Sequence, residues 1–278
     1  MLILFGIIFF FAFTSLVAFL SYLWPSKFIS DITPGNLGLQ YEEVSFQTSD
    51  NITLQGWFIP HSNPETAKTI IALHGWPADK GNILPSLSFL NQRYNLFVFD
   101  FRYLGQSKGR YSTAGAKETE DLKAALRYLQ SRGIKEVGVW GFSMGGAVAL
   151  MTAPSSPEIK AVVSEASYAS LDRMASEAFR IPFLKYPLGF SINLWAKIFF
   201  GITLYDISPV QSAKQLQIPV LLIHSTTDRV IPFSHAQLLK EALKDNPKAE
   251  FWFQENLSHG QFASEYQQRI QDFFDSNL

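Results

Sequence analysis

Two short stretches of the chain carry a serine flanked by glycines in the pattern Gly-x-Ser-x-Gly. They are GQSKG at residues 105–109 and GFSMG at residues 141–145. The pattern is typical of a serine that attacks a carbonyl group, but it also arises by chance. The surrounding sequence must therefore decide between Ser107 and Ser143.

The sequence around Ser143 predicts the sharp strand-to-helix turn that a nucleophilic serine needs. The apolar run VGVW leads into GFSMG, and MGGAVALMTA follows with small residues that suit a closely packed helix. The stretch after GQSKG is RYSTAGAKETE, whose glycines, serine and threonines indicate a loop. We expect Ser143 to be the nucleophile and Ser107 to lie in a structural turn.

A serine hydroxyl is a weak nucleophile and needs a general base. The chain has five histidines, namely His61, His74, His224, His235 and His259. We expect His61 and His235 at the surface or at a helix end, and His224 inside a buried strand. His259 follows the last predicted strand, at the sheet edge where the nucleophile is expected, and we predict that it is the base.

The base in turn needs an acidic residue that orients it. Asp228 ends the apolar run PVLLIHSTTD and lies between Ser143 and His259 in the chain, so it is the preferred candidate. Glu165 ends the preceding apolar run and is the alternative acid. Asp100 ends an earlier run, and we expect it to organise the loop that follows.

Two backbone N–H groups are expected to bind the oxyanion that forms during attack on a carbonyl. The N–H of Met144 follows the nucleophile directly. The second should come from the loop after the first buried strand, where Trp76 stands. His74, in the same loop, is expected to support it through hydrogen bonds.

Short apolar runs alternate with helical stretches through most of the chain, which predicts an α/β fold with a mostly parallel sheet covered by helices on both faces. An antiparallel hairpin is expected first, in residues 42–60. About fifty residues, 168–216, interrupt the alternation and predict a helical cap. Aromatic and apolar side chains crowd this cap; we expect them to pack it onto the sheet, with an acyl-binding cleft or a bilayer contact as alternatives.

The first residues of the chain are apolar and carry no charged side chain before Lys27. A run of this length predicts a transmembrane anchor over residues 1–24, followed by a linker over 25–41 and one domain of catalytic size over 42–278. A cleaved signal peptide is the competing interpretation. The sequence does not indicate on which side of a membrane the domain lies.

The balance of 23 basic and 24 acidic residues gives a net charge of −1, which argues against a nucleic-acid partner. The chain contains no cysteine, which excludes disulfides and thiolate catalysis. Neither a metal nor an organic cofactor is needed for the chemistry predicted here.

Five stretches in this order resemble the α/β-hydrolase superfamily: ALHGWPADKGN, DFRYLGQSKG, GFSMGG, SPVQSAKQLQIPVLLIHSTTDRVIP and the late SHG. The chain is similar to the branch of serine esterases, monoglyceride-lipase-like proteins and serine aminopeptidase-like hydrolases, which often carry a helical cap. Members commonly have the loop D-x-R-G-x-G-x-S-x-G, where this chain has Tyr103 in place of the first glycine.

The resemblance and the residues together predict a membrane-anchored serine hydrolase. Its substrate is expected to be a small-molecule carboxylic ester, lipid-like if it carries an acyl chain, with a thioester or an amide as alternatives. Acyl transfer to an alcohol or amine, and a scaffold without catalysis, are the competing functions.

Overall fold

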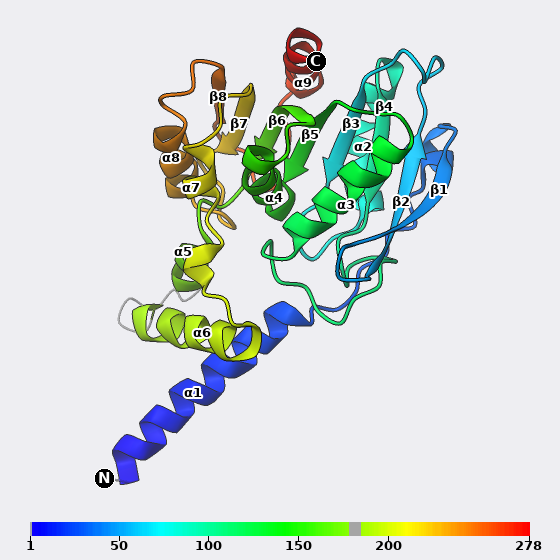
Figure 1. Ribbon diagram of the computed structural model, residues 1–278. Coiled ribbons are helices and arrows are strands. Elements are labelled where there is room, and N and C mark those ends of the chain that lie inside the picture. Colours follow the sequence, from blue (N-terminus) through cyan, green and yellow to red (C-terminus); the bar gives the residue numbers. More distant parts are fainter. Residues whose placement is uncertain (1, 178–184) are drawn as a thin grey trace.

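The computed structural model describes residues 2–177 and 185–278, with side chains for residues 6, 9–177 and 186–278. These residues form an eight-stranded sheet in the order β1-β2-β4-β3-β5-β6-β7-β8 (Figure 1). The strands are β1 (Glu42–Gln47), β2 (Thr53–Ile59), β3 (Thr69–Leu73), β4 (Asn95–Phe99), β5 (Val137–Phe142), β6 (Ile159–Glu165), β7 (Val220–Ser225) and β8 (Ala249–Gln254).

The strand directions confirm the predicted hairpin and the mostly parallel sheet. β1 pairs antiparallel with β2, and β2 pairs antiparallel with β4. All other neighbouring strands are parallel. The carboxyl ends of β3 to β8 therefore lie along one edge of the sheet, which is where ligands bind in folds of this kind.

Helices cover both faces of the sheet, as the sequence predicts. On one face, Leu122 and Val148 of α3 and α4 belong to one buried cluster. On the other, Ile83 and Ile270 of α2 and α9 belong to a second. The helices are α1 (Leu2–Leu23), α2 (Lys80–Leu87), α3 (Glu118–Ser131), α4 (Met144–Thr152), α5 (Leu171–Glu177), α6 (Lys185–Phe200), α7 (Pro209–Ala213), α8 (Phe233–Ala242) and α9 (Tyr266–Asn277).

The predicted cap corresponds to α5, α6 and α7, which lie between β6 and β7 in the chain. Residues 178–184 of this insertion lie outside the described residues. Figure 1 shows α5 and α6 away from the body of the sheet, with α6 crossing α1. The indole N–H of Trp195 on α6 donates to the hydroxyl of Ser15 on α1 at 3.1 Å.

The amino-terminal helix α1 is joined to the domain at its last turn. The backbone N–H of Ser112 donates to the carbonyl of Leu23 at 3.0 Å, and the indole of Trp24 donates to the carbonyl of Arg110 at 2.7 Å. Among the described residues, no single helix combines the length and the apolar composition required to cross a membrane. The apolar part of α1 there covers Phe9–Leu23, and the segments Tyr186–Phe200 and Leu204–Ala213 qualify only as a pair bent by 88°.

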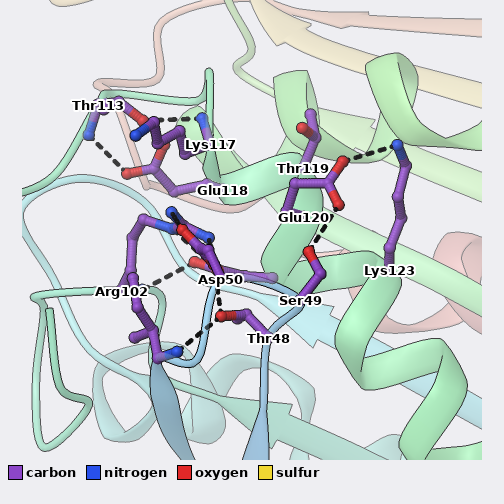
Figure 2. Close-up of polar contacts among 12 residues, drawn as sticks. Thr48, Ser49, Asp50, Arg102, Thr113, Lys117, Glu118, Thr119, Glu120 and Lys123 are labelled. Atoms are coloured by element: carbon purple, nitrogen blue, oxygen red, sulfur yellow. Dashed lines mark hydrogen bonds and ion pairs between the residues drawn. The ribbon is translucent and has the colours of Figure 1, made fainter. Parts of the chain in front are cut away.

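Buried charges hold the long loop between β4 and α3. The guanidinium of Arg102, 2% exposed, bonds to the carboxylate of Asp121 at 2.7 Å and to that of Asp50 at 2.9 Å. The carboxylate of Glu118 accepts hydrogen bonds from the backbone N–H groups of Thr113 and Gly115. Figure 2 shows Arg102 facing Asp50, and Glu118 facing Thr113. The loop is therefore held by ionic contacts beneath the sheet edge.

We expect Asp121→Ala to lower the free energy of unfolding by about 3 to 5 kcal/mol, because it leaves the buried Arg102 guanidinium without its buried partner. The exposed pair of Glu241 and Lys244 supplies the control. Glu241→Ala should change stability by less than about 0.5 kcal/mol. Urea unfolding measures both, and equal effects of the two substitutions would contradict the structural role of Arg102.

Candidate active site

Ser143 lies on the turn between β5 and α4, as the sequence predicts. Its backbone has φ 55° and ψ −114°, a conformation that costs energy for a residue with a side chain. The backbone N–H of Ser143 donates to the carbonyl of Glu165 at the end of β6 at 2.8 Å. The hydroxyl thus sits above the sheet edge at the amino terminus of α4, where unpaired N–H groups face it.

Close packing explains the two glycines of GFSMG. A Cβ at Gly141 would overlap the carbonyl of Gly145, and a Cβ at Gly145 would overlap the carbonyl of Leu73 on β3. Any side chain at either position would force the turn open. The motif around Ser143 is therefore required by the backbone path.

His259 and Asp228 form a direct pair. The Nδ1 atom of His259 lies 2.7 Å from Oδ2 of Asp228. The other carboxylate oxygen accepts from the backbone N–H groups of Val230 at 2.7 Å and Ile231 at 3.0 Å. A carboxylate can only accept, so Nδ1 of His259 carries the proton and Nε2 is left unprotonated in the neutral ring.

Hydrogen bonding keeps Asp228 ionised. Burial by itself would raise the pKa of this carboxyl, but the hydrogen bond and charge of His259, together with the N–H groups of Ile231 and Val230, lower the pKa below its usual value. The group is therefore suited to hold a positive charge on His259.

Ser143 and His259 lie at the same sheet edge. Phe142 directly precedes Ser143, and its ring centroid lies 4.8 Å from that of His259. No hydrogen bond joins the Ser143 hydroxyl to His259 among the described residues; such bonds often tighten only when substrate binds. The structure thus brings Ser143, Asp228 and His259 to one edge, from the ends of β5, β7 and β8.

The loop of residues 74–79 after β3, which we call the oxyanion loop after its expected role, also approaches Ser143. Met144 is the first residue of α4. In the loop after β3, a Cβ built on Gly75 would lie 3.3 Å from Cβ of Ser143, so this loop passes directly beside Ser143. Trp76 follows, and its ring stacks on Tyr22 of α1 with centroids 5.2 Å apart.

His74 fixes the base of the oxyanion loop. Its Nδ1 donates to the carbonyl of Gly75 at 2.7 Å, and its Nε2 accepts from the backbone N–H of Phe101 at 3.0 Å. Burial lowers the pKa of His74, which favours the neutral ring that these two bonds require. This geometry matches the supporting role expected for His74.

A buried ion pair, which the sequence did not suggest, joins the oxyanion loop to the loop after β4. The Nζ of Lys80 lies 2.7 Å from Oδ2 of Asp100, and both side chains are almost fully buried. Asp100 also accepts from the backbone N–H of Gln106 at 2.8 Å. Asp100 therefore organises its loop as expected. The alternation of apolar runs and helices in the sequence does not indicate that Lys80 is buried.

Ser107 has a structural environment. Its side chain is fully buried; the hydroxyl donates to the carbonyl of Asp100 at 2.6 Å and accepts from the backbone N–H of Gln55 at 2.9 Å. Both hydrogen-bonding roles are thus occupied by the backbone of neighbouring segments. GQSKG is a turn that ties β2 to the end of β4.

His235 lies in the first turn of α8, near a helix start as predicted, but the expectation of a surface position is wrong. The side chain is fully buried. Its Nδ1 accepts from the backbone N–H of Ala169 at 2.9 Å, and its Nε2 lies 3.0 Å from Glu177 on α5. α8 packs against the start of the cap, a tertiary contact that the position of His235 near a helix start does not reveal. His224 is buried as expected, with Nε2 bonded to the carbonyl of Ile231 at 2.9 Å.

Glu165, the alternative acid, bonds to Tyr266 and makes no hydrogen bond to His259 in the described part of the chain. Its carboxylate accepts from the hydroxyl of Tyr266 on α9 at 2.5 Å, and that hydroxyl accepts from the indole N–H of Trp140 at 3.0 Å. Burial raises the pKa of Glu165 to about 8, although the hydrogen bonds oppose this. The carboxyl is therefore mostly protonated around pH 7.

The comparisons with known proteins agree with this geometry. A sequence model described as the α/β hydrolase fold matches residues 68–194. The protein YfhR of Escherichia coli O157:H7 is 32% identical over 211 residues, which cover 73% of this chain and 69% of YfhR. The chain belongs to the α/β-hydrolase family.

This α/β hydrolase is also similar to two other proteins over most of its length. The α/β hydrolase domain-containing protein WAV2 of Arabidopsis thaliana is 28% identical over 79% of this chain and 72% of WAV2. The structure of the Pyrococcus furiosus esterase Pf2001 superimposes with a TM-score of 0.76 at 29% identity, covering 91% of this chain and 98% of the esterase. These likenesses support a hydrolase with a small-molecule substrate.

We expect Glu165→Gln to remove a pH dependence of stability between the unfolded pKa of 4.5 and the folded pKa of about 8. In this window the folded protein holds a proton that the unfolded chain has released, so the free energy of unfolding of the wild type falls as pH rises. Glutamine does not titrate. The variant should gain stability relative to the wild type as pH rises, by on the order of a few kcal/mol in total.

Urea unfolding of both proteins at a series of pH values across this window measures the difference. Asp245→Asn, at an exposed site, controls for the loss of a carboxylate. A stability difference between Glu165→Gln and wild type that stays constant from the acidic to the basic end would contradict a protonated Glu165 in the folded protein.

Proposed function

We propose that this α/β hydrolase is a serine hydrolase that cleaves a carboxylic ester through Ser143, His259 and Asp228. The observation that carries the proposal is the pairing of His259 Nδ1 with Asp228 at 2.7 Å, at the same sheet edge as the strained turn of Ser143. This pairing leaves Nε2 of His259 free to accept a proton, which a structural histidine in the core seldom does.

Each residue has one role in the proposed reaction. Ser143 attacks the ester carbonyl while His259 takes its hydroxyl proton through Nε2 and returns it to the leaving alcohol. The carboxylate of Asp228 holds the Nδ1 proton and stabilises the charged ring. The N–H groups of Met144 and Trp76 bind the oxyanion, and water, deprotonated by His259, then releases the acid from Ser143.

The choice of an ester as the substrate is supported by the likeness to esterases of the same fold. Three residues of these types can also cleave thioesters and amides. We further propose that α1 attaches the protein to a membrane. Its support is the uncharged, apolar sequence before Lys27 and the exposed aromatic side chains of Tyr22 and Trp24 at the end of the helix.

A fluorophosphonate probe, which reacts with activated serines, tests the nucleophile. We expect the probe to label the wild type and Ser107→Ala but not Ser143→Ala, because Ser143 shares its sheet edge with the proposed base His259, whereas the hydroxyl of Ser107 is buried against the backbone. Ser107→Ala is the matched control, since it removes an identical hydroxyl from the other Gly-x-Ser-x-Gly motif. Labelling that survives Ser143→Ala and is lost in Ser107→Ala would overturn the assignment, and no labelling of any protein would favour a scaffold.

We expect Asp228→Asn to lower kcat on a p-nitrophenyl ester by about ten-thousandfold, since an amide NH₂ facing Nδ1 favours the tautomer that protonates Nε2. KM should change little, because Asp228 does not contact the substrate. Asp245→Asn makes the same chemical change at an exposed site and should retain wild-type kinetics. A kcat of Asp228→Asn within tenfold of wild type would move the role of the acid to another residue, with Glu165 the first to test.

A further inference from the structure

Large apolar side chains are exposed on the outer faces of both α1 and α6. On a helix at the surface of a soluble domain, the outward side is normally polar. Exposed apolar side chains gathered on two helices that contact each other indicate an interaction site. We call this set the apolar face; its members are Phe9, Phe10, Phe13 and Val17 of α1 and Phe190, Leu194 and Ile198 of α6, which are 45% to 70% exposed.

The apolar face is not the side of α6 that holds the cap in place. Leu188, Ile192 and Ala196 lie on the opposite side of α6 and are buried; the last two belong to the same cluster as Phe19 and Leu23 of α1. Phe190, Leu194 and Ile198 follow one another at intervals of four, so they form a separate stripe along the helix. α6 therefore has one apolar side that packs on the protein and another that meets the surroundings.

Basic side chains surround the base of α1. Lys27, Lys108 and Arg110 are exposed, and we call them the basic collar. They are close together because the Nζ of Lys27 donates to the carbonyl of Ser107 at 3.3 Å and the indole of Trp24 donates to the carbonyl of Arg110. No ion pair to the collar occurs in the part of the chain that the structure describes.

The sequence near the collar carries little opposing charge. Residues 1–30 and 101–117 contain no aspartate or glutamate, and the exposed Asp31 is the acidic residue that follows Lys27 in the chain. An uncharged apolar surface with a cationic rim is complementary to a bilayer that carries anionic headgroups, since the apolar side chains enter the acyl region and the cations meet the phosphates. A typical protein–protein interface carries about ten direct hydrogen bonds, whereas the side chains of the apolar face supply none.

We propose that the apolar face and the basic collar lie on an anionic lipid bilayer, and that the substrate is an ester of a long acyl chain taken from that bilayer. This inference rests on the proposed ester hydrolysis for its substrate, but the placement on a bilayer stands on the face and collar alone. It applies whether α1 crosses the bilayer or lies along it.

The apolar face adjoins the proposed site. The buried cluster beneath α1 and α6 includes Ala147 of α4, four residues after the nucleophile, and Ile231, three residues after Asp228. Tyr22, at the end of α1, stacks on Trp76 of the oxyanion loop. A bilayer seated on the apolar face would thus be next to the carboxyl edge of the sheet, where an acyl chain leaving the membrane would reach Ser143.

The absence of cysteine allows a direct test with single-cysteine variants of the full chain. Phe190→Cys lies on the apolar face, and Leu238→Cys on α8 is a matched control at an exposed leucine away from it. Each is labelled with the fluorophore NBD and bound to vesicles of phosphatidylcholine and phosphatidylserine. We expect the label at 190 to shift to the blue and to lose emission when the lipids carry doxyl groups, whereas the label at 238 loses emission only to aqueous iodide.

Equal iodide quenching at both positions, with no doxyl quenching at 190, would overturn the proposal. Protection of the label at 190 from iodide that persists without lipid and disappears when the protein is diluted would also overturn the proposal. That result would mean that a second copy of the protein covers the apolar face. Neither readout involves ester cleavage. Failure of the proposed function appears separately, as absence of fluorophosphonate labelling.

The collar has its own test with the same NBD label at 190. The double variant Lys108→Glu and Arg110→Glu should lose most of the doxyl quenching on vesicles with phosphatidylserine, because the charge reversal repels anionic headgroups. Lys214→Glu changes an exposed lysine on another surface and serves as the control. Its doxyl quenching should equal that of the labelled protein without a charge reversal. Equal quenching in the collar variant and the control would remove the collar from the proposal.

The substrate class is tested by hydrolysis of a long-chain ester embedded in the same vesicles, compared with a short-chain p-nitrophenyl ester in solution. We expect Phe190→Glu with Leu194→Glu to reduce hydrolysis of the embedded ester about tenfold or more relative to the soluble one. Leu238→Glu is the control and should leave the ratio unchanged. An unchanged ratio in the double variant, in a protein that cleaves both esters, would overturn the substrate class and leave the serine hydrolase intact.

Discussion

The turn between β5 and α4 is the constraint on which the remainder of the site depends. It reverses the chain so sharply that Gly141 and Gly145 touch each other and the neighbouring strand β3. Ser143 is held there with a positive φ. The cost of this conformation is met by the sheet, because the Ser143 N–H bonds to β6 and α4 packs on the face that α3 shares.

The loops that surround this turn are shaped by buried charges. Asp100 binds both the side chain and the backbone N–H of Lys80, and Arg102, two residues later, binds Asp121. Buried ion pairs lose much of their attraction to desolvation, so their main effect is to exclude other loop conformations. The oxyanion loop and the GQSKG turn share the carboxylate of Asp100, and neither can shift without disturbing the other.

The alternation of short apolar runs with helices was sufficient to predict the sheet, its leading hairpin and the common sheet edge at which Ser143, Asp228 and His259 lie. It was insufficient where tertiary contacts determine the bounds of a helix or the burial of a side chain. α2 begins at Lys80, because Asp79 caps it, three residues before its first apolar side chain, Ile83. His235 is buried because α8 meets the cap, and no periodicity of a single helix contains that contact.

The substitution of Tyr103 for glycine in the family's loop pattern has a structural explanation that the sequence could not supply. Tyr103 has φ 68°, in the left-handed region that glycine adopts most easily. Its hydroxyl donates to the carbonyl of Pro25 at 3.1 Å, and its ring lies 5.1 Å from the ammonium of Lys27. A side chain at this position therefore gains contacts with the segment that follows α1, which offset the backbone strain.

These contacts show how the amino-terminal segment is joined to the domain. An apolar run at the start of a chain indicates where a membrane could be met, but not how the run is joined to the domain. Here the last turn of α1 is bonded to the loop after β4, packed on the cap and stacked on the oxyanion loop through Tyr22 and Trp76. Because α1 is held at three places around the carboxyl edge of the sheet, the orientation of the site follows the orientation of α1. A helix on a flexible tether would impose no such relation.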